Sequence, residues 1–97
     1  MPFLTSVEEA EALAGTVFDG RTAGGTVKLR LDTVTRLGQG LRPEGESFSL
    51  VFSAPASLAF GQGTVGLSHP DGSDETLVFV VPIGREGERA LYEAVFN

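Results

Sequence analysis

The 97-residue sequence contains no cysteine and no tryptophan, and it has a single histidine and a single methionine. Without cysteine the chain forms no disulfide, offers no thiol nucleophile and supplies no thiolate ligand for zinc or an iron–sulfur cluster. One histidine alone cannot build a metal centre of the imidazole type. The sequence therefore predicts no bound metal and no cofactor.

Basic residues are few. Seven Lys and Arg stand against thirteen Asp and Glu, so the formal net charge is -6 at pH 7. The basic residues are scattered along the chain, whereas neutralising the phosphates of a nucleic acid requires them to be clustered. We therefore expect an acidic protein with no nucleic-acid partner and little attraction to anionic membranes.

Long hydrophobic runs are also missing. The longest apolar run, residues 77–81, has the length of a β-strand. A membrane-spanning helix needs about 20 apolar residues, so no membrane span is expected. The opening residues 1–6 show neither the basic segment nor the long apolar segment of a signal peptide, and we expect no signal peptide there.

The length fits a single domain, which we place at residues 1–97. Residues 5–15 read as a short helix, because Thr5 or Ser6 is followed three residues later by a glutamate, as in a capping box. Gly15 is a suitable residue to end this helix. The apolar positions of the segment share one face, so the helix should dock on the rest of the domain.

After the helix the apolar residues alternate with polar ones, which is the period of a β-strand. The phase slips after Asp32, which predicts a β-bulge. Asp19-Gly20 is interpreted as a turn, and residues 75–83, the most apolar segment, as a central strand. The predicted strands cover residues 16–18, 26–32, 47–53, 64–69, 75–83 and 91–97. The expected fold is mainly β: a small antiparallel β-barrel or sandwich of five or six strands with one short N-terminal helix.

Candidate catalytic and metal-binding residues are few. His69, with Asp71 nearby and serines elsewhere, provides the residue types of a hydrolase triad, but a histidine entering a Pro-Asp-Gly turn is the favoured reading. A calcium loop of the EF-hand type starting at Asp71 would need Gly and Glu where the sequence has Thr76 and Pro82. Gln62, between two glycines, is expected to turn inward and satisfy backbone groups. No catalytic, cofactor-binding or metal-binding residue is therefore assigned.

The C-terminal segment is the candidate for an interaction. As a strand, residues 91–97 present Tyr92, Ala94 and Phe96 on one face, and such a strand can pair with an open edge of another subunit. The alternative is a strand internal to the monomer's own sheet. The candidate interaction residues are Tyr92, Val95, Phe96 and Asn97.

Four motifs together resemble a family of short bacterial β-rich proteins that carries no assigned activity. They are Phe48-x-Leu50-x-Phe52, Gln62-Gly63-x-x-x-Leu67-x-His69-Pro70, Leu77-x-x-x-x-Val81-Pro82-Ile83-Gly84 and the final Tyr92-Glu93-Ala94-Val95-Phe96-Asn97. The resemblance covers nearly the whole chain, and the final motif is its most specific part. It implies an accessory or structural module encoded near phage tail-collar-like proteins, within a phage-tail-like or filamentous particle.

Three functions follow from these observations. The first is a non-enzymatic structural or protein-interaction module whose partner is a protein, either a further copy of the chain or a larger structural subunit. The second is a small-molecule or carbohydrate binding β-module, because seven Phe and one Tyr can provide a stacking surface. A hydrolase that uses His69 is the least favoured. The compartment is either the cytoplasm or, as part of an assembled particle, the exterior of the cell.

Overall fold

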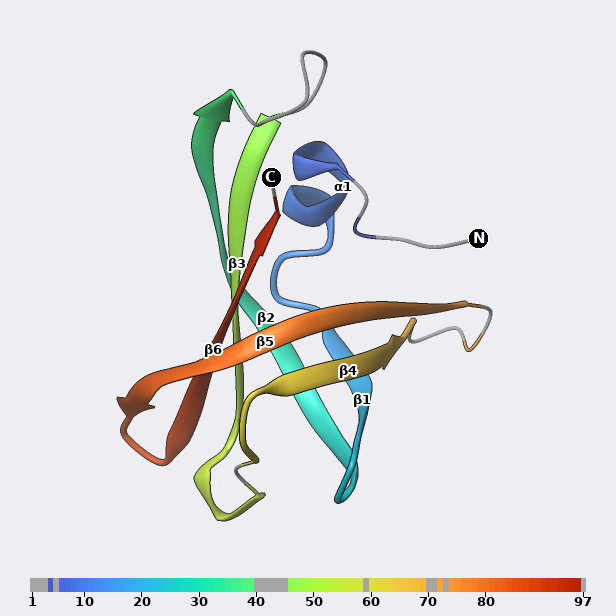
Figure 1. Ribbon diagram of the computed structural model, residues 1–97, viewed down its shortest axis with the longest axis vertical. Coiled ribbons are helices and arrows are strands. Elements are labelled where there is room, and N and C mark those ends of the chain that lie inside the picture. Colours follow the sequence, from blue (N-terminus) through green and yellow to red (C-terminus); the bar gives the residue numbers. More distant parts are fainter. Residues whose placement is uncertain are drawn as a thin grey trace.

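A computed structural model describes residues 4, 6–39, 46–58, 60–69, 72 and 74–96. The described residues form one short α-helix, six strands and a 3-10 turn (Figure 1). In chain order these elements are α1 (Val7–Ala12), β1 (Val17–Thr22), β2 (Gly25–Gln39), β3 (Glu46–Pro55), η1 (Ala56–Leu58), β4 (Gly63–Ser68), β5 (Glu75–Glu86) and β6 (Arg89–Phe96). The sequence also predicts a turn at Arg42-Pro43-Glu44-Gly45, which lies outside the described residues.

The six strands form one antiparallel sheet that closes on itself in the order β1-β2-β3-β6-β5-β4. The sheet is thus a barrel-like ring, in which every strand has a neighbour on each side. This confirms the predicted mainly β fold with antiparallel strands and a short N-terminal helix.

Helix α1 begins as its sequence predicts. The Ser6 hydroxyl accepts a hydrogen bond from the Glu9 backbone N–H at 3.1 Å, so Ser6 is the N-cap. The helix ends at Ala12, earlier than the predicted Gly15. Six residues are too few for a helix that is stable by itself, and α1 is held by the burial of Val7 and Ala10 in the core.

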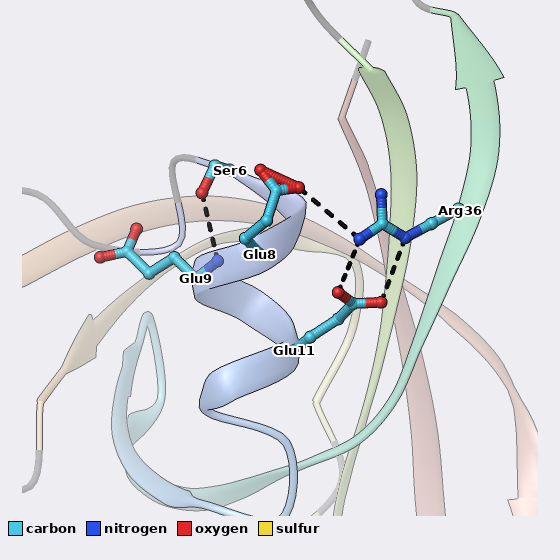
Figure 2. A network of polar contacts seen from close by, with 5 residues as sticks. All are labelled: Ser6, Glu8, Glu9, Glu11 and Arg36. Atoms are coloured by element: carbon cyan, nitrogen blue, oxygen red, sulfur yellow. Dashed lines mark hydrogen bonds and ion pairs between the residues drawn. The ribbon is translucent and has the colours of Figure 1, made fainter.

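Two glutamates of α1 also bind the sheet (Figure 2). Arg36 of β2 donates from Nη2 to Glu11 Oε1 at 2.8 Å and from Nε to Glu11 Oε2 at 3.2 Å. The Glu8 carboxylate lies 3.6 Å from Arg36 Nη2. Arg36 and Glu11 are about half exposed and Glu8 is more exposed, so this contact fixes the orientation of α1 more than it stabilises the fold.

Strand β1 corrects one expectation. Asp19-Gly20 does not form a turn, because β1 runs through both residues to Thr22 and the chain reverses at residues 23–24. Gly20 faces the interior, where a Cβ atom would lie only 2.7 Å from Leu29 Cδ1. The glycine is needed here for close packing, and the Asp-Gly turn signal misled the sequence reading.

Strand β2 contains the β-bulge that the sequence predicts. Its pairing with β3 shifts register between Leu31 and Thr33, as the predicted bulge after Asp32 requires, and again between Arg36 and Gly38. The bulge restores the inward phase of the strand, so that Val34 packs against the core. The strand continues to Gln39, beyond the predicted boundary.

The core lies inside the ring and consists of the inward side chains of all six strands together with α1. In Figure 1, α1 lies at the upper end of the ring, and the segment between β3 and β4 lies at the lower end. The buried apolar residues are Leu4, Val7, Ala10, Phe18, Val27, Leu29, Leu31, Phe48, Leu50, Phe52, Ala54, Val65, Leu67, Val78, Val80, Ala90, Tyr92 and Ala94.

Candidate functional site

The outer face of the ring is mostly polar on four of its strands. Outward positions on β1 and β2 carry charges that pair with one another, such as Lys28 with Asp19. Outward positions on β4 include Thr64 and Ser68, whereas the outward serines of β3, Ser49 and Ser53, are buried. The exposed charged residues at outward positions include Asp19, Arg21, Lys28 and Arg30. Strands β1, β2 and β4 thus show the alternation of a sheet with one face in water.

Strand β5 departs from this pattern. Thr76, Val78 and Val80 face inward, and the alternate positions on the outside are also apolar. Leu77 is 63% exposed, Phe79 55% and Val81 39%. The predicted central strand does lie between two neighbours, β4 and β6, but its outer face stays exposed because a ring covers only the inner face of each strand. We call Leu77, Phe79 and Val81 the β5 stripe.

The seam between β5 and β6 is only partly closed by strand pairing. Residues 75–80 of β5 pair with β4, and from Val81 onward the strand pairs with β6. Among the described residues, the β5–β6 pairing ends at Val81↔Glu93. Beyond this point β6 continues to Phe96 paired with β3. Figure 1 shows the two strands diverging, so within the described part of the chain β5 and the end of β6 each leave an edge without a strand partner.

A groove of about 240 Å³ lies where the strands diverge. Besides the β5 stripe, its lining includes the half-exposed Val95 of β6. Glu93, at the closed end of the seam, is the charged residue of this lining. Among the described residues no ion pair involves Glu93, whereas Glu75 at the start of β5 is paired with Arg21 at 2.7 Å. The groove is thus apolar, with one carboxylate at its closed end.

Strand β6, which carries the candidate interaction residues predicted from the sequence, lies beside this groove but is paired within the monomer's own sheet. The pairing of β6 with β3 runs from Arg89 to Phe96, and β5 pairs with its first half. The expectation that this strand adds to an open edge of another subunit is therefore replaced by the internal alternative: β6 is part of the monomer's own ring. Closure of the sheet is a long-range property that the local sequence does not reveal.

The candidate interaction residues divide accordingly. Tyr92 is buried, with 1% exposure, and its hydroxyl accepts from the Phe60 N–H at 2.7 Å and donates to the Phe60 carbonyl at 2.9 Å. Phe96 faces inward and stacks on Phe48, with ring centroids 4.8 Å apart. Val95 is exposed and lines the groove. Asn97 lies outside the described residues. The sequence reading missed the β5 stripe, although the run at 77–81 was its signal.

The other candidate residues lie away from the seam. His69 follows β4, where its backbone N–H donates to the Asp74 carbonyl at 3.1 Å and its carbonyl accepts from Gly72 at 2.8 Å. These bonds hold the turn between β4 and β5, as the favoured reading requires. Asp71, the proposed partner in a triad or calcium loop, lies outside the described residues. Gln62 is exposed, so the expectation that it turns inward is wrong.

A polar cluster occupies the outer surface at the β2 bulge. Arg30 contacts Asp32 at 2.5 Å, and Arg89 donates to the Ser53 hydroxyl at 2.8 Å and to its carbonyl at 2.9 Å. Burial raises the pKa of Asp32, but hydrogen bonds from Arg30 and Ser53 and the charges of Arg30 and Arg89 together hold that pKa below its ordinary value. The bulge residue is thus tied to β3 and β6.

Asp32→Asn is expected to lower the free energy of unfolding at pH 7 by about 1 kcal/mol or less. Because the folded pKa lies below the unfolded one, ionised Asp32 stabilises the fold above about pH 3.9 and ceases to do so as the pH falls through the folded pKa. Urea unfolding at pH 7 and in acid checks this, with Asp19→Asn as the control at a more exposed carboxylate. A difference that stays constant in acid contradicts the assignment.

The described residues contain no cluster of three or more histidine, cysteine, aspartate or glutamate side chains arranged to hold a metal ion. They also contain no helix that is both long and apolar enough to span a membrane. The groove at the β5–β6 seam is therefore the surface with the clearest functional character in the part of the chain that the structure describes.

The fold and this surface define a small mainly β domain, in which six antiparallel strands form a ring with one incompletely paired seam. The chain belongs to the family described as "Domain of unknown function (DUF6916)", whose model matches residues 5–96. The resemblance to a family without an assigned activity is confirmed to this extent. No curated protein and no solved structure matches the chain.

Proposed function

We propose that the protein is a non-enzymatic structural or protein-interaction module, which docks on a protein partner through the β5 stripe and the groove beside it. The observation that carries the proposal is the apolar outer face of β5. Single exposed apolar side chains are ordinary on protein surfaces, but contiguous apolar patches mark interaction sites. Here three outward positions in succession are apolar, and Val95 extends the patch to β6.

In its finer form, the module is an accessory component of a phage-tail-like or filamentous bacterial assembly. The support for this form is the resemblance of the chain's motifs, above all the final Tyr92-Glu93-Ala94-Val95-Phe96-Asn97. Such a component works in the cytoplasm during assembly or outside the cell within the finished particle. The net charge of -6 favours a protein over a nucleic acid as its partner.

The alternative, a small-molecule or carbohydrate binding β-module, has weaker support. Ligand sites in small barrels are concave and bury most of their ligand. The inward positions of this ring are filled by apolar side chains, including Phe18, Phe52 and Tyr92 with at most 1% exposure. The groove at the seam, at about 240 Å³, is smaller than the roughly 300–1,000 Å³ of typical small-molecule pockets.

Phe79→Lys combined with Leu77→Lys is expected to weaken partner association at least about tenfold, since burying a charge in an apolar contact costs more than 1.4 kcal/mol. Native mass spectrometry of the lightly tagged protein isolated from its own host measures this association. The original protein should carry a stoichiometric second protein that the double variant lacks. Because both positions face solvent, the variant should unfold at nearly the same urea concentration as the original protein.

Val17→Lys is the matched control, because Val17 is 46% exposed but lies on β1. It should retain the partner. The proposal fails if the double variant carries the same partner as the original protein. A retained small mass in place of a protein would instead support the alternative binding module.

A further inference from the structure

We infer that the occupant of the groove is an extended strand of a different protein, which pairs with the open edge of β5 and carries a basic side chain opposite Glu93. This inference rests on the proposed function and specifies its partner. It concerns the chemistry of the occupant: a β-strand with apolar side chains at alternate positions and Lys or Arg near the closed end of the seam.

The backbone supplies the first argument. Along residues 77–80 of β5, alternate N–H and C=O groups point toward β4 and toward the seam. Among the residues that the structure describes, the β6 pairing ends at Val81↔Glu93, and no strand pairs with the seam side of this segment. An added strand satisfies such an edge with backbone hydrogen bonds and uses alternate side chains for recognition. A flat docking surface would leave the edge unpaired.

The side chains supply the second argument. A strand laid along this edge continues the sheet, so its outward side chains lie next to Leu77 and Phe79. Leu77 pairs with Gly66 on the β4 side, where the Arg21–Glu75 ion pair lies over the glycine, so the apolar face of Leu77 is open toward the groove. On the other side of the groove Val95 is half-exposed. An apolar side chain from the added strand would therefore contact both walls of the groove.

Charge decides between a second copy and a different protein. A second copy would bring a further net charge of -6 and, in a two-fold arrangement over this groove, its own Glu93. Like charges facing one another oppose such a contact. A basic residue of another protein would give Glu93 the ion-pair partner that the described residues do not provide. Electrostatic complementarity thus favours a basic strand from a different protein.

The test uses a defined probe: a short acetylated and amidated peptide of about six residues, the usual strand length, in which two valines and then a lysine occupy the alternate positions of one face and threonines occupy the positions between them. Valine and lysine thus share the face of Leu77, Phe79 and Glu93. Hydrogen exchange, followed by NMR on the full chain, is measured with and without the peptide. We expect alternate amides within residues 77–80 and near 94–96 to exchange at least about tenfold more slowly when the peptide is bound. The same peptide with lysine replaced by glutamate should bind at least about tenfold more weakly at low salt.

Two matched variants sharpen the test. A valine–lysine peptide methylated on the backbone nitrogens of one edge cannot pair as a strand and should give no protection. Glu93→Gln should lower the affinity of the protein for the lysine peptide about threefold, which is the contribution of an exposed ion pair. The same substitution should not lower the affinity for the glutamate peptide. The unmethylated peptide should still protect the β5 edge in this variant.

Failure takes distinct forms. If the lysine peptide gives no protection of residues 77–80, strand addition is overturned, even where the β5 stripe variant loses its natural partner and the proposed function stands. If protection of this edge rises with the concentration of the chain alone, the occupant is a second copy and the inference is also wrong. If the stripe variant keeps its partner, the proposed function itself fails.

Discussion

Tyr92→Ala is expected to lower the free energy of unfolding by about 3–5 kcal/mol, the range for removing a large aromatic side chain from a core. Tyr92 is 1% exposed and stacks on Phe60 with ring centroids 4.2 Å apart. Its hydroxyl also satisfies both the N–H and the carbonyl of Phe60. Truncation opens a cavity and leaves these two backbone groups without their partner, so the lower end of the ring loses its closure.

Urea unfolding and thermal melting measure the effect. For a domain of this size the melting temperature should fall by at least about 12 °C, since each kcal/mol corresponds to about 4–8 °C. Tyr92→Phe is the matched variant: it keeps the ring and removes only the hydroxyl, and should lower the free energy of unfolding by about 1–3 kcal/mol. If the alanine variant were no less stable than the phenylalanine variant, the stacking of the Tyr92 ring on Phe60 would not stabilise the fold, which contradicts this prediction.

Gly20→Val is expected to have the second-largest effect, a loss of about 3 kcal/mol or more, at the upper end of the range for overpacked cores. A Cβ atom at Gly20 would lie 2.7 Å from Leu29 Cδ1, 3.1 Å from Val65 Cγ1 and 3.2 Å from the Val27 carbonyl oxygen. Leu29 and Val65 are themselves buried, so neither can move outward to make room. The branched side chain would therefore push β1 away from β2 and β4.

Gly24→Ala is the control for backbone entropy. Gly24 lies in the turn after β1, where the nearest atom to an added Cβ is Thr22 Oγ1 at 4.0 Å. This variant should unfold within about 0.5 kcal/mol of the original protein, as exposed substitutions usually do. Equal stability of the two glycine variants in urea would show that Gly20 does not face the interior.

Local patterns predicted much of the fold because they report local physical chemistry. Ser6 has a side chain that can cap a helix, and the structure uses it in this way. The phase slip after Asp32 predicted a bulge because Leu31 and Val34, three positions apart, can face the same side of a strand only if the strand contains one extra residue between them. The Asp19-Gly20 dipeptide led to a wrong turn prediction, because the sequence does not distinguish a glycine that permits close packing from a glycine that permits a turn.

The candidate site was less accessible to such reasoning. The run at residues 77–81 predicted a strand correctly, but its apolar residues fit a strand buried on both faces as well as one with an apolar outer face. Only the closure of the ring shows that Leu77 and Phe79 point to solvent. The same closure gives Tyr92 a place in the core, although its position near the C-terminus had favoured a contact with another subunit.

The sequence by itself determined the mainly β class, the short capped helix, the bulge in β2 and the acidic surface, because each depends on neighbouring residues or on composition alone. Only the tertiary structure decided which strands are neighbours, where the seam opens and which apolar side chains remain outside. Strand order joins residues far apart in the chain, as where β1 pairs with β4. Since pairing across such distances depends on the whole core, no local pattern encodes it.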